Sequence, residues 1–277
     1  MCLTGGSLER STGLSELPET GIDDFSSRAG AALVTGASGG LGAAAARLLA
    51  SRGATVALTY KSNADAVEQL AAAIRSEGGE VSCHQLDLVD AERCAAVVAE
   101  VVDRHGAIHT LIHAAGPHVP QRHLSTVPVQ DMRAQIEQDA SGLFNLLSPA
   151  IPELRRSQGA IVAVTTAATG RYAVRDGLSA VPKAAVEMLI RALAAEEGRF
   201  GVRANCVGPG MLSDGMAERL IASGELDQVA LEAARRNIPL RRFGTAADIA
   251  EAVVFLASDR AGYISGQLLA VDGGFGA

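Results

Sequence analysis

The chain has 277 residues, of which 48% are hydrophobic and 20% are charged, and its formal net charge is −7. This length suits one large α/β domain, and the negative charge together with the scarcity of aromatic residues argues against a nucleic-acid partner. No apolar run approaches the ~18 residues of a membrane span, the N-terminus lacks a secretory pattern and the cysteines form no CxxC pair, so we expect a cytoplasmic protein with reduced thiols.

Residues 1–28 are rich in small polar and acidic residues and lack any helical or strand period, which predicts a mobile tail before one domain at 29–277. In that domain, short apolar runs alternate with segments of helical spacing. The runs predict strands at 31–35, 54–60, 81–86, 108–113, 160–165 and 268–271. The helical segments are 43–50, 64–76, 91–105, 130–154, 181–197 and 246–257. This alternation predicts an α/β fold with a Rossmann-type, doubly wound parallel sheet and helices on both faces.

A glycine-rich loop follows the first predicted strand. Gly36, Gly40 and Gly42, with Ser38 and Leu41 between them, lie just before an alanine-rich helix. Glycines permit a tight turn and a close approach of the backbone to a pyrophosphate, and the N-terminus of the helix favours its negative charge. The loop therefore predicts a dinucleotide site.

The end of the second predicted strand discriminates between cofactors. A site for NAD places an acid there to bind the ribose 2′-hydroxyl, but this chain has Tyr60, Lys61 and Ser62. A lysine and two hydroxyls suit a 2′-phosphate, so NADP(H) is favoured over NAD(H). Taken alone, Lys61 is equally well read as a solvated loop lysine.

From about residue 30 to 277 the chain resembles the short-chain dehydrogenase/reductase family. Residues 35–42 fit its TGxxxGxG motif, and residues 238–274 look like its C-terminal signature. The resemblance implies NAD(P) binding, a homotetramer or homodimer, and a small-molecule substrate, with the segment 213–237 as the lid of the pocket. Further cofactor contacts are implied at Asp87, Leu88, Ala114, Ala115, Gly116, Lys183, Pro209 and Gly210.

The catalytic positions of the family are only partly matched. A set of Asn, Ser, Tyr and Lys carries the family's reaction, and the positions that match it are Asp139, Thr166, Ser179 and Lys183. Lys183 alone is unchanged, and the resemblance implies that it binds the nicotinamide ribose. Thr166 keeps a hydroxyl. Ser179 keeps the spacing of four residues from Lys183, but its hydroxyl is far less acidic than a phenol, whose pKa of ~10 a nearby ammonium can lower.

The proton donor must therefore be sought elsewhere, unless Ser179 orders a water for that purpose. Tyr172 is the first candidate, because a loop phenol could swing into the vacant place, although loop tyrosines are usually surface residues. Asp176 could act as an acid if it is buried, with a solvated carboxylate or a partner of Arg175 as the alternative. His118 and His123 could donate protons near neutral pH, but a lone loop histidine is more often inert.

These features predict an NADP(H)-dependent oxidoreductase that reduces a carbonyl, or oxidises an alcohol, of a small organic molecule with a non-standard proton donor. The serine at position 179 leaves two alternatives open: a dehydratase, isomerase or cyclase on the same scaffold, and a catalytically silent nucleotide-binding subunit. All six histidines lie between residues 84 and 123 without an acid or cysteine at ligand spacing, so no metal site is predicted.

Overall fold

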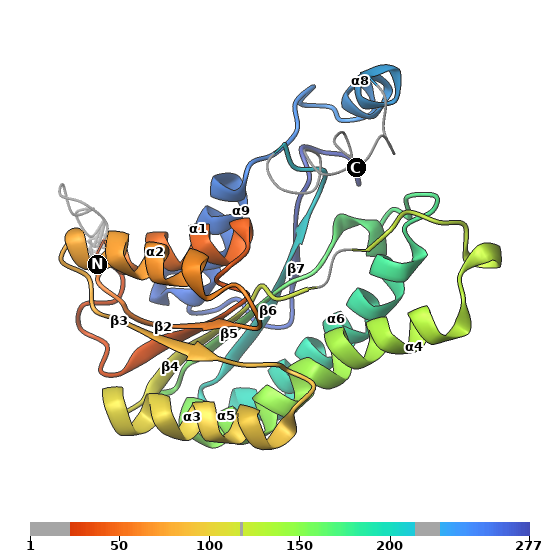
Figure 1. The fold of residues 1–277 in the computed structure, drawn as a ribbon. Helices are drawn as coiled ribbons and strands as arrows, with labels where there is room; N and C mark the ends of the chain where they lie inside the picture. Colours follow the sequence, from red (N-terminus) through yellow and green to blue (C-terminus); the bar gives the residue numbers. More distant parts are fainter. Residues whose placement is uncertain (1–22, 117–118, 214–227) are drawn as a thin grey trace, which may run out of the picture.

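The computed structural model describes residues 23–116, 119–213 and 228–277, and it confirms the predicted Rossmann-type fold (Figure 1). A seven-stranded sheet has the order β3-β2-β1-β4-β5-β6-β7, and every neighbouring pair is parallel. The strands are β1 (Ala31–Thr35), β2 (Thr55–Tyr60), β3 (Val81–Gln85), β4 (Ile108–His113), β5 (Ala160–Val164), β6 (Arg203–Pro209) and β7 (Leu268–Val271).

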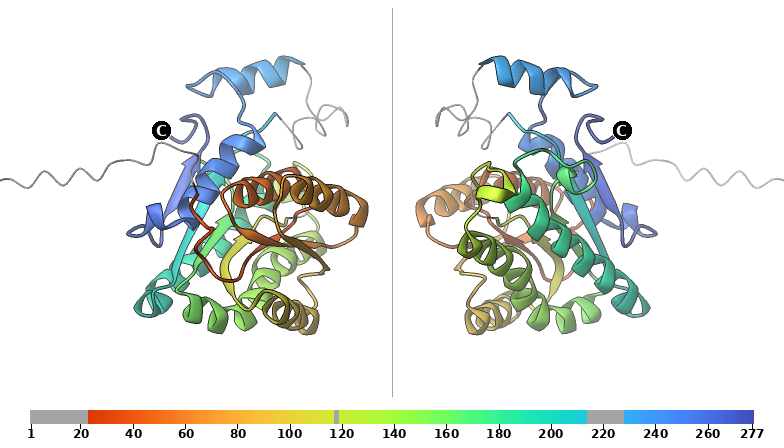
Figure 2. Two further views of the ribbon diagram at one scale, coloured as in Figure 1. Left: turned by 90° about the vertical axis from the view of Figure 1, so that its left-hand side faces the viewer. Right: turned by 90° about the vertical axis from the view of Figure 1, so that its right-hand side faces the viewer.

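Helices cover both faces of the sheet, as Figure 1 shows. One face carries α1 (Gly40–Ser51), α2 (Ala64–Ser76) and α9 (Ala246–Ala257), and the other carries α3 (Ala91–His105), α5 (Gly142–Ser157) and α6 (Gly177–Glu197). The helix α4 (Val129–Ile136) precedes α5, and α8 (Gln228–Arg236) stands out from the rest in both views of Figure 2. None of the helices within the described ranges is long and apolar enough to span a bilayer.

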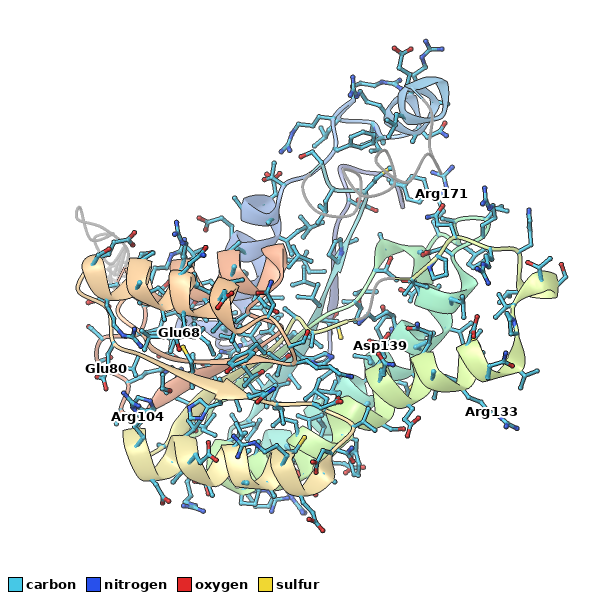
Figure 3. The ribbon with its side chains drawn as sticks, in the orientation of Figure 1. Glu68, Glu80, Arg104, Arg133, Asp139 and Arg171 are labelled. Atoms are coloured by element: carbon cyan, nitrogen blue, oxygen red, sulfur yellow. The ribbon has the colours of Figure 1, made fainter. Side chains whose placement is uncertain are left out.

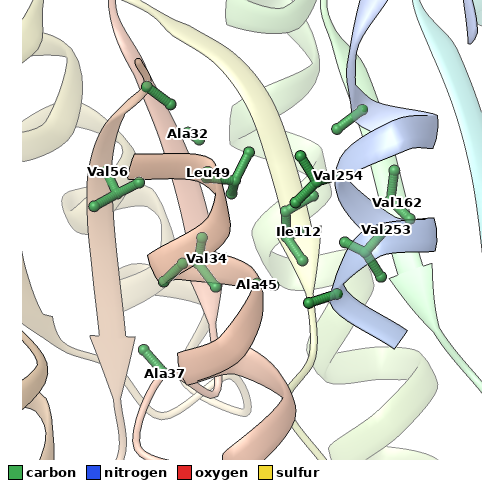
Figure 4. Packing of buried hydrophobic residues seen from close by; sticks show 14 of the residues in the cluster. Ala32, Val34, Ala37, Ala45, Leu49, Val56, Ile112, Val162, Val253 and Val254 are labelled. Carbon is green, nitrogen blue, oxygen red and sulfur yellow. The ribbon is translucent and has the colours of Figure 1, made fainter. Parts of the chain in front are cut away.

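The central strands β1 and β5 are almost entirely apolar because both of their faces are covered. Successive side chains of β1 enter opposite cores, as the period of two requires. Ala32 and Val34 pack with Leu49 of α1 and Val253 of α9 (Figure 4), whereas Leu33 packs on the side of α3, α5 and α6.

The strand β6 was missed by the sequence analysis, which found six of the seven strands. Polar residues interrupt the apolar run of Arg203–Pro209 and hide its strand character. In the fold, Asn205 is fully buried because its Nδ2 donates to the Ile264 carbonyl (2.8 Å) and its Oδ1 accepts from the backbone N–H of Gln267 (3.0 Å). These tertiary hydrogen bonds compensate for the loss of water contacts when a polar strand residue is buried in the core.

Two predicted helices have different boundaries in the structure. The segment 130–154 is divided into α4, a π-helical turn (Glu137–Ser141) and α5. The helix predicted to begin near Pro182 begins instead at Gly177, and Pro182 lies inside it. The backbone N–H groups of Ser179 and Ala180 donate to the Asp176 carbonyl, at 3.0 and 2.8 Å, and so start the helix earlier.

The described chain packs against the domain from a point earlier than residue 29. Phe25 is buried and stacks against His109 with ring centroids 6.0 Å apart, and Asp24 forms ion pairs with Arg52 (3.3 Å) and Arg260 (3.1 Å). Residues 23–28 therefore belong to the folded unit, in contrast to the predicted tail. Residues 1–22 of that tail lie outside the described residues.

Candidate functional site

The residues singled out from the sequence gather where the parallel strands end. Because the strands run in one direction, the loops after β1, β2, β4, β5 and β6 meet at the carboxyl edge of the sheet, the usual position of ligand sites in such folds. Figure 3 shows Asp139 and Arg171 on this side, on segments of the chain that face the strand ends.

The glycines of the loop after β1 differ in whether the fold leaves space for a side chain. Gly36 has φ +71°, and a Cβ there would lie 2.7 Å from backbone atoms of Ala114 and Ala115; a Cβ on Gly42 would overlap the Gly36 carbonyl. The fold itself therefore requires these two glycines. Gly40 is exposed at the start of α1, and a Cβ there would meet nothing within 4 Å among the described atoms. Open space over a helix N-terminus leaves room for an anionic group to approach the backbone.

Two predicted cofactor residues, which follow β2 and β3, are in contact with each other. The Nζ atom of Lys61 lies 2.9 Å from Oδ2 of Asp87, and both side chains are largely exposed. The hydrogen bond from Lys61 holds the pKa of the Asp87 carboxyl below its usual range. Tyr60 is half-buried and Ser62 exposed beside them, and the Leu88 carbonyl accepts a hydrogen bond from Asn145 (3.0 Å).

His113, the last residue of β4, has a structural role. It is fully buried, and a hydrogen bond joins its Nδ1 and the Thr35 hydroxyl (3.1 Å), whose oxygen accepts from the backbone N–H of Ala115 (3.3 Å). Burial, with the charge of Lys183 nearby, lowers the pKa of His113 to about 3. A neutral ring then joins the ends of β1 and β4, and the sequence analysis did not foresee this link.

Lys183, Asp139 and Gly116 converge in the structure. The Nζ atom of Lys183 donates to Oδ1 of Asp139 at 2.9 Å, and the two side chains are 12% and 2% exposed. Asp139 lies in the π-helical turn between α4 and α5, and such turns occur often at functional sites. A Cβ on Gly116 would lie 3.3 Å from this Nζ atom, so the glycine leaves the ammonium room.

Thr166 follows β5, and a second hydroxyl, that of Thr169, lies three residues later in the chain. The Oγ1 atom of Thr166 accepts from the backbone N–H of Ala168 (3.2 Å), and the Thr169 hydroxyl donates to Oε1 of Glu187 (2.7 Å). Glu187 is buried on α6, four residues after Lys183. The sequence analysis missed Thr169 and Glu187, although the helical spacing of Lys183 and Glu187 was a usable signal.

Pro209 and Gly210, predicted to turn beside the nicotinamide, end β6. The backbone N–H of Gly210 donates to the Val271 carbonyl (3.0 Å), and a Cβ on Gly210 would approach the Cα of Asp272 to 2.7 Å. A pocket beyond this turn is lined in part by Met211, Leu240 and Arg242, and it contains none of the predicted catalytic residues. Of the predicted lid, residues 214–227 lie outside the described residues.

The candidate proton donors lie in different surroundings. Ser179 is half-buried in the first turn of α6, and Tyr172 is 51% exposed; neither hydroxyl makes a hydrogen bond within the described part of the chain. His123 is exposed, and His118 lies outside the described residues.

Asp176 is half-buried, and it is not the partner of Arg175. The guanidinium of Arg175 donates instead to the Gln121 carbonyl at 2.9 Å. Burial raises the pKa of the Asp176 carboxyl to about 6. No group of three or more potential metal ligands occurs in the ranges that the structure describes.

Comparisons with known proteins find relatives that match most of the chain. Residues 36–276 match the family described as Enoyl-(Acyl carrier protein) reductase. The chain is 34% identical over 244 residues to the 3-oxoacyl-(acyl-carrier-protein) reductase FabG of Staphylococcus aureus, across 88% of this chain and 96% of that protein. It is 32% identical over 242 residues to L-fucose dehydrogenase of Oryctolagus cuniculus, across 87% of this chain and 83% of that protein.

A solved structure is similar over nearly the whole chain. A mutant short-chain dehydrogenase/reductase of Serratia marcescens superposes with a TM-score of 0.81 at 28% sequence identity. The alignment covers 90% of this chain and 99% of that one.

Proposed function

The chain belongs to the short-chain dehydrogenase/reductase family of oxidoreductases, and from this we propose that it is an NADP(H)-dependent enzyme that reduces a carbonyl of a small organic molecule, or oxidises the corresponding alcohol. The observation that carries the proposal is the combination of open space over Gly40 with an ammonium, that of Lys183, directed at Gly116 on the same edge of the sheet.

The residues at this edge fit a dinucleotide with a 2′-phosphate. Gly40 and the N-terminus of α1 would face the pyrophosphate, and Lys61 would pair with the 2′-phosphate. Asp87 and Leu88 would contact the adenine, and Lys183 would bind the nicotinamide ribose. When bound, the nicotinamide supplies or accepts the hydride.

The chain's own residues then orient the substrate and the cofactor. Asp139 holds the Lys183 ammonium at a fixed place beside Gly116. The Thr166 hydroxyl donates a hydrogen bond to the substrate oxygen and stabilises the charge that develops on it. Ser179 stands where the family carries a tyrosine, so the proton comes from another group.

Gly40→Ala is expected to weaken NADPH binding without weakening the empty protein. The new methyl group meets no protein atom but occupies the space that the pyrophosphate needs. NADPH at ~100 times its dissociation constant should stabilise the wild-type protein by about 2.7 kcal/mol, and the variant should lose most of that. Thermal melting with and without NADPH measures both quantities. Normal melting together with a full NADPH shift in the variant would contradict the predicted site.

Lys61→Met is expected to raise the Kd for NADPH by about tenfold to a hundredfold, because a hydrogen bond to a charged group contributes about 1.5–3 kcal/mol. The Kd for NADH should hardly change, since that nucleotide lacks the 2′-phosphate. Fluorescence titration of the bound nicotinamides gives both constants. An equal rise in the Kd for NADPH and in the Kd for NADH would exclude recognition of the 2′-phosphate by Lys61.

We also propose a homotetramer or homodimer. Phe144 on α5 and Val181 and Met188 on α6 are large apolar side chains that are 51%, 44% and 60% exposed. Val181 and Met188 are seven residues apart and so share one face of α6. An apolar helix face of this kind is typical of an interface between subunits.

A further inference from the structure

Asp176 carries a half-buried carboxyl group that has no partner among the described residues. Within the described ranges its side chain makes no hydrogen bond or ion pair, although it precedes the first turn of α6. Its backbone forms a bridge with Arg122, and Leu124 packs closely over Gly177. The segment after β4 therefore lies over the start of α6, where Asp176 is half-buried.

The charged groups around Asp176 are engaged elsewhere. Arg122 lies 3.8 Å from Asp131 of α4, and Arg175 donates to the Gln121 carbonyl. Arg133 of α4 lies on the outer side of that helix in Figure 3, and His123 is exposed. Consequently, burial is the one cause that raises the pKa of Asp176 to about 6.

Asp176 is the N-cap residue of α6, at a helical spacing from the residues of the candidate active site. A spacing of three residues to Ser179 and of seven to Lys183 keeps all three on one side of the helix. Side chains three residues apart have Cβ atoms about 5–6 Å apart, a span that one water molecule can bridge. The Ser179 hydroxyl, which is free of other hydrogen bonds in the described residues, can accept one proton while it donates another.

We propose that Asp176 is the proton donor of the reduction and that its proton reaches the substrate oxygen through the hydroxyl of Ser179. This inference rests on the proposed function. In the reduction, the carbonyl carbon gains the hydride as the π bond to oxygen breaks. The oxygen gains the proton of the Ser179 hydroxyl, and the Ser179 oxygen regains a proton from Asp176. The Asp176 carboxylate then takes a proton from solvent, so one NADPH and one proton are consumed per carbonyl.

Tyr172 is the less suitable donor. Its side chain is half exposed, and it would have to leave the surface to reach the place above Ser179. Asp176 is the N-cap residue of the helix that carries Ser179 and Lys183.

The test compares Asp176→Asn with Asp131→Asn, a matched loss of a partly exposed carboxyl on the adjacent α4, and with Tyr172→Phe. We expect the kcat for carbonyl reduction to fall by about 10²–10⁴-fold in Asp176→Asn alone. NADPH binding, followed by the shift in melting temperature, should stay the same in all variants. In the wild-type protein the kcat should decline as the pH rises above about 6, where Asp176 loses its proton. This decline should be absent in Asp176→Asn.

A readout without turnover checks the buried carboxyl itself. Because the pKa of Asp176 is raised from 3.8 to about 6, its protonated form stabilises the fold below pH 3.8, and that contribution is lost as the pH rises through about 6. Asp176→Asn should therefore melt higher than the wild type at pH 8 and close to it at pH 4.

The outcomes separate the inference from the proposed function. Absence of NADPH binding in the wild type would overturn the proposed function. If the wild type binds NADPH and turns over, an unchanged kcat in Asp176→Asn, or a loss in Tyr172→Phe instead, would overturn the inference alone. Equal melting temperatures of Asp176→Asn and the wild type at pH 8 would also overturn it.

Discussion

Asp139→Ala is expected to lower the free energy of unfolding by about 3 kcal/mol, because it leaves the Lys183 ammonium nearly buried without its partner. The two groups are 2.9 Å apart, and their side chains are 2% and 12% exposed. Removing one member of such a pair costs more than the pair contributes, since the remaining charge keeps its desolvation penalty. Urea unfolding followed by circular dichroism, at one protein concentration, measures the change.

Two further variants serve as controls for that measurement. Asp139→Asn keeps the size and a hydrogen-bond acceptor, so it should cost less than alanine. Asp103→Ala removes an exposed acid of α3 and should change the stability by no more than about 0.5 kcal/mol. If Asp139→Ala is no more damaging than Asp103→Ala, the ion pair does not hold Lys183.

Gly36→Ala is expected to lower the free energy of unfolding by about 3 kcal/mol, for two separate reasons. Its φ of +71° disfavours any residue with a Cβ by about 1–2 kcal/mol. The new methyl group would also lie 2.7 Å from backbone atoms of Ala114 and Ala115, which cannot rotate away as a side chain can. Overpacking of this kind costs about 1–3 kcal/mol. The same urea unfolding measures the sum.

Gly78→Ala separates the two contributions. Gly78 has φ +87°, but a Cβ there would meet nothing within 4 Å. It should therefore show the backbone strain alone and be less damaging than Gly36→Ala. An equal loss of unfolding free energy in the two variants would mean that the close approach between the glycine loop and the residues after β4 adds nothing to the cost of Gly36→Ala.

Much of the fold could be predicted because its signals are local. The apolar runs of the buried parallel strands and the helical spacing between them identified six of the seven strands and the layers. The glycine loop was recognisable because tight turns restrict residue choice at neighbouring positions. The strand β6 was not, because Asn205 is compensated by Ile264 and Gln267 from a distant part of the chain.

The sequence by itself determined the fold class and the family and predicted where the catalytic residues would stand, since each depends on patterns within short stretches of chain. Only the tertiary structure decided what surrounds those positions. It brought Asp139 to Lys183 across 44 residues, turned Arg175 toward Gln121, and covered Asp176 with the segment after β4. The surroundings of a carboxyl set its pKa, and burial arises from segments that are remote in sequence. Asp139 thus becomes the partner of Lys183, while Asp176 is a half-buried carboxyl whose pKa is raised by burial to about 6.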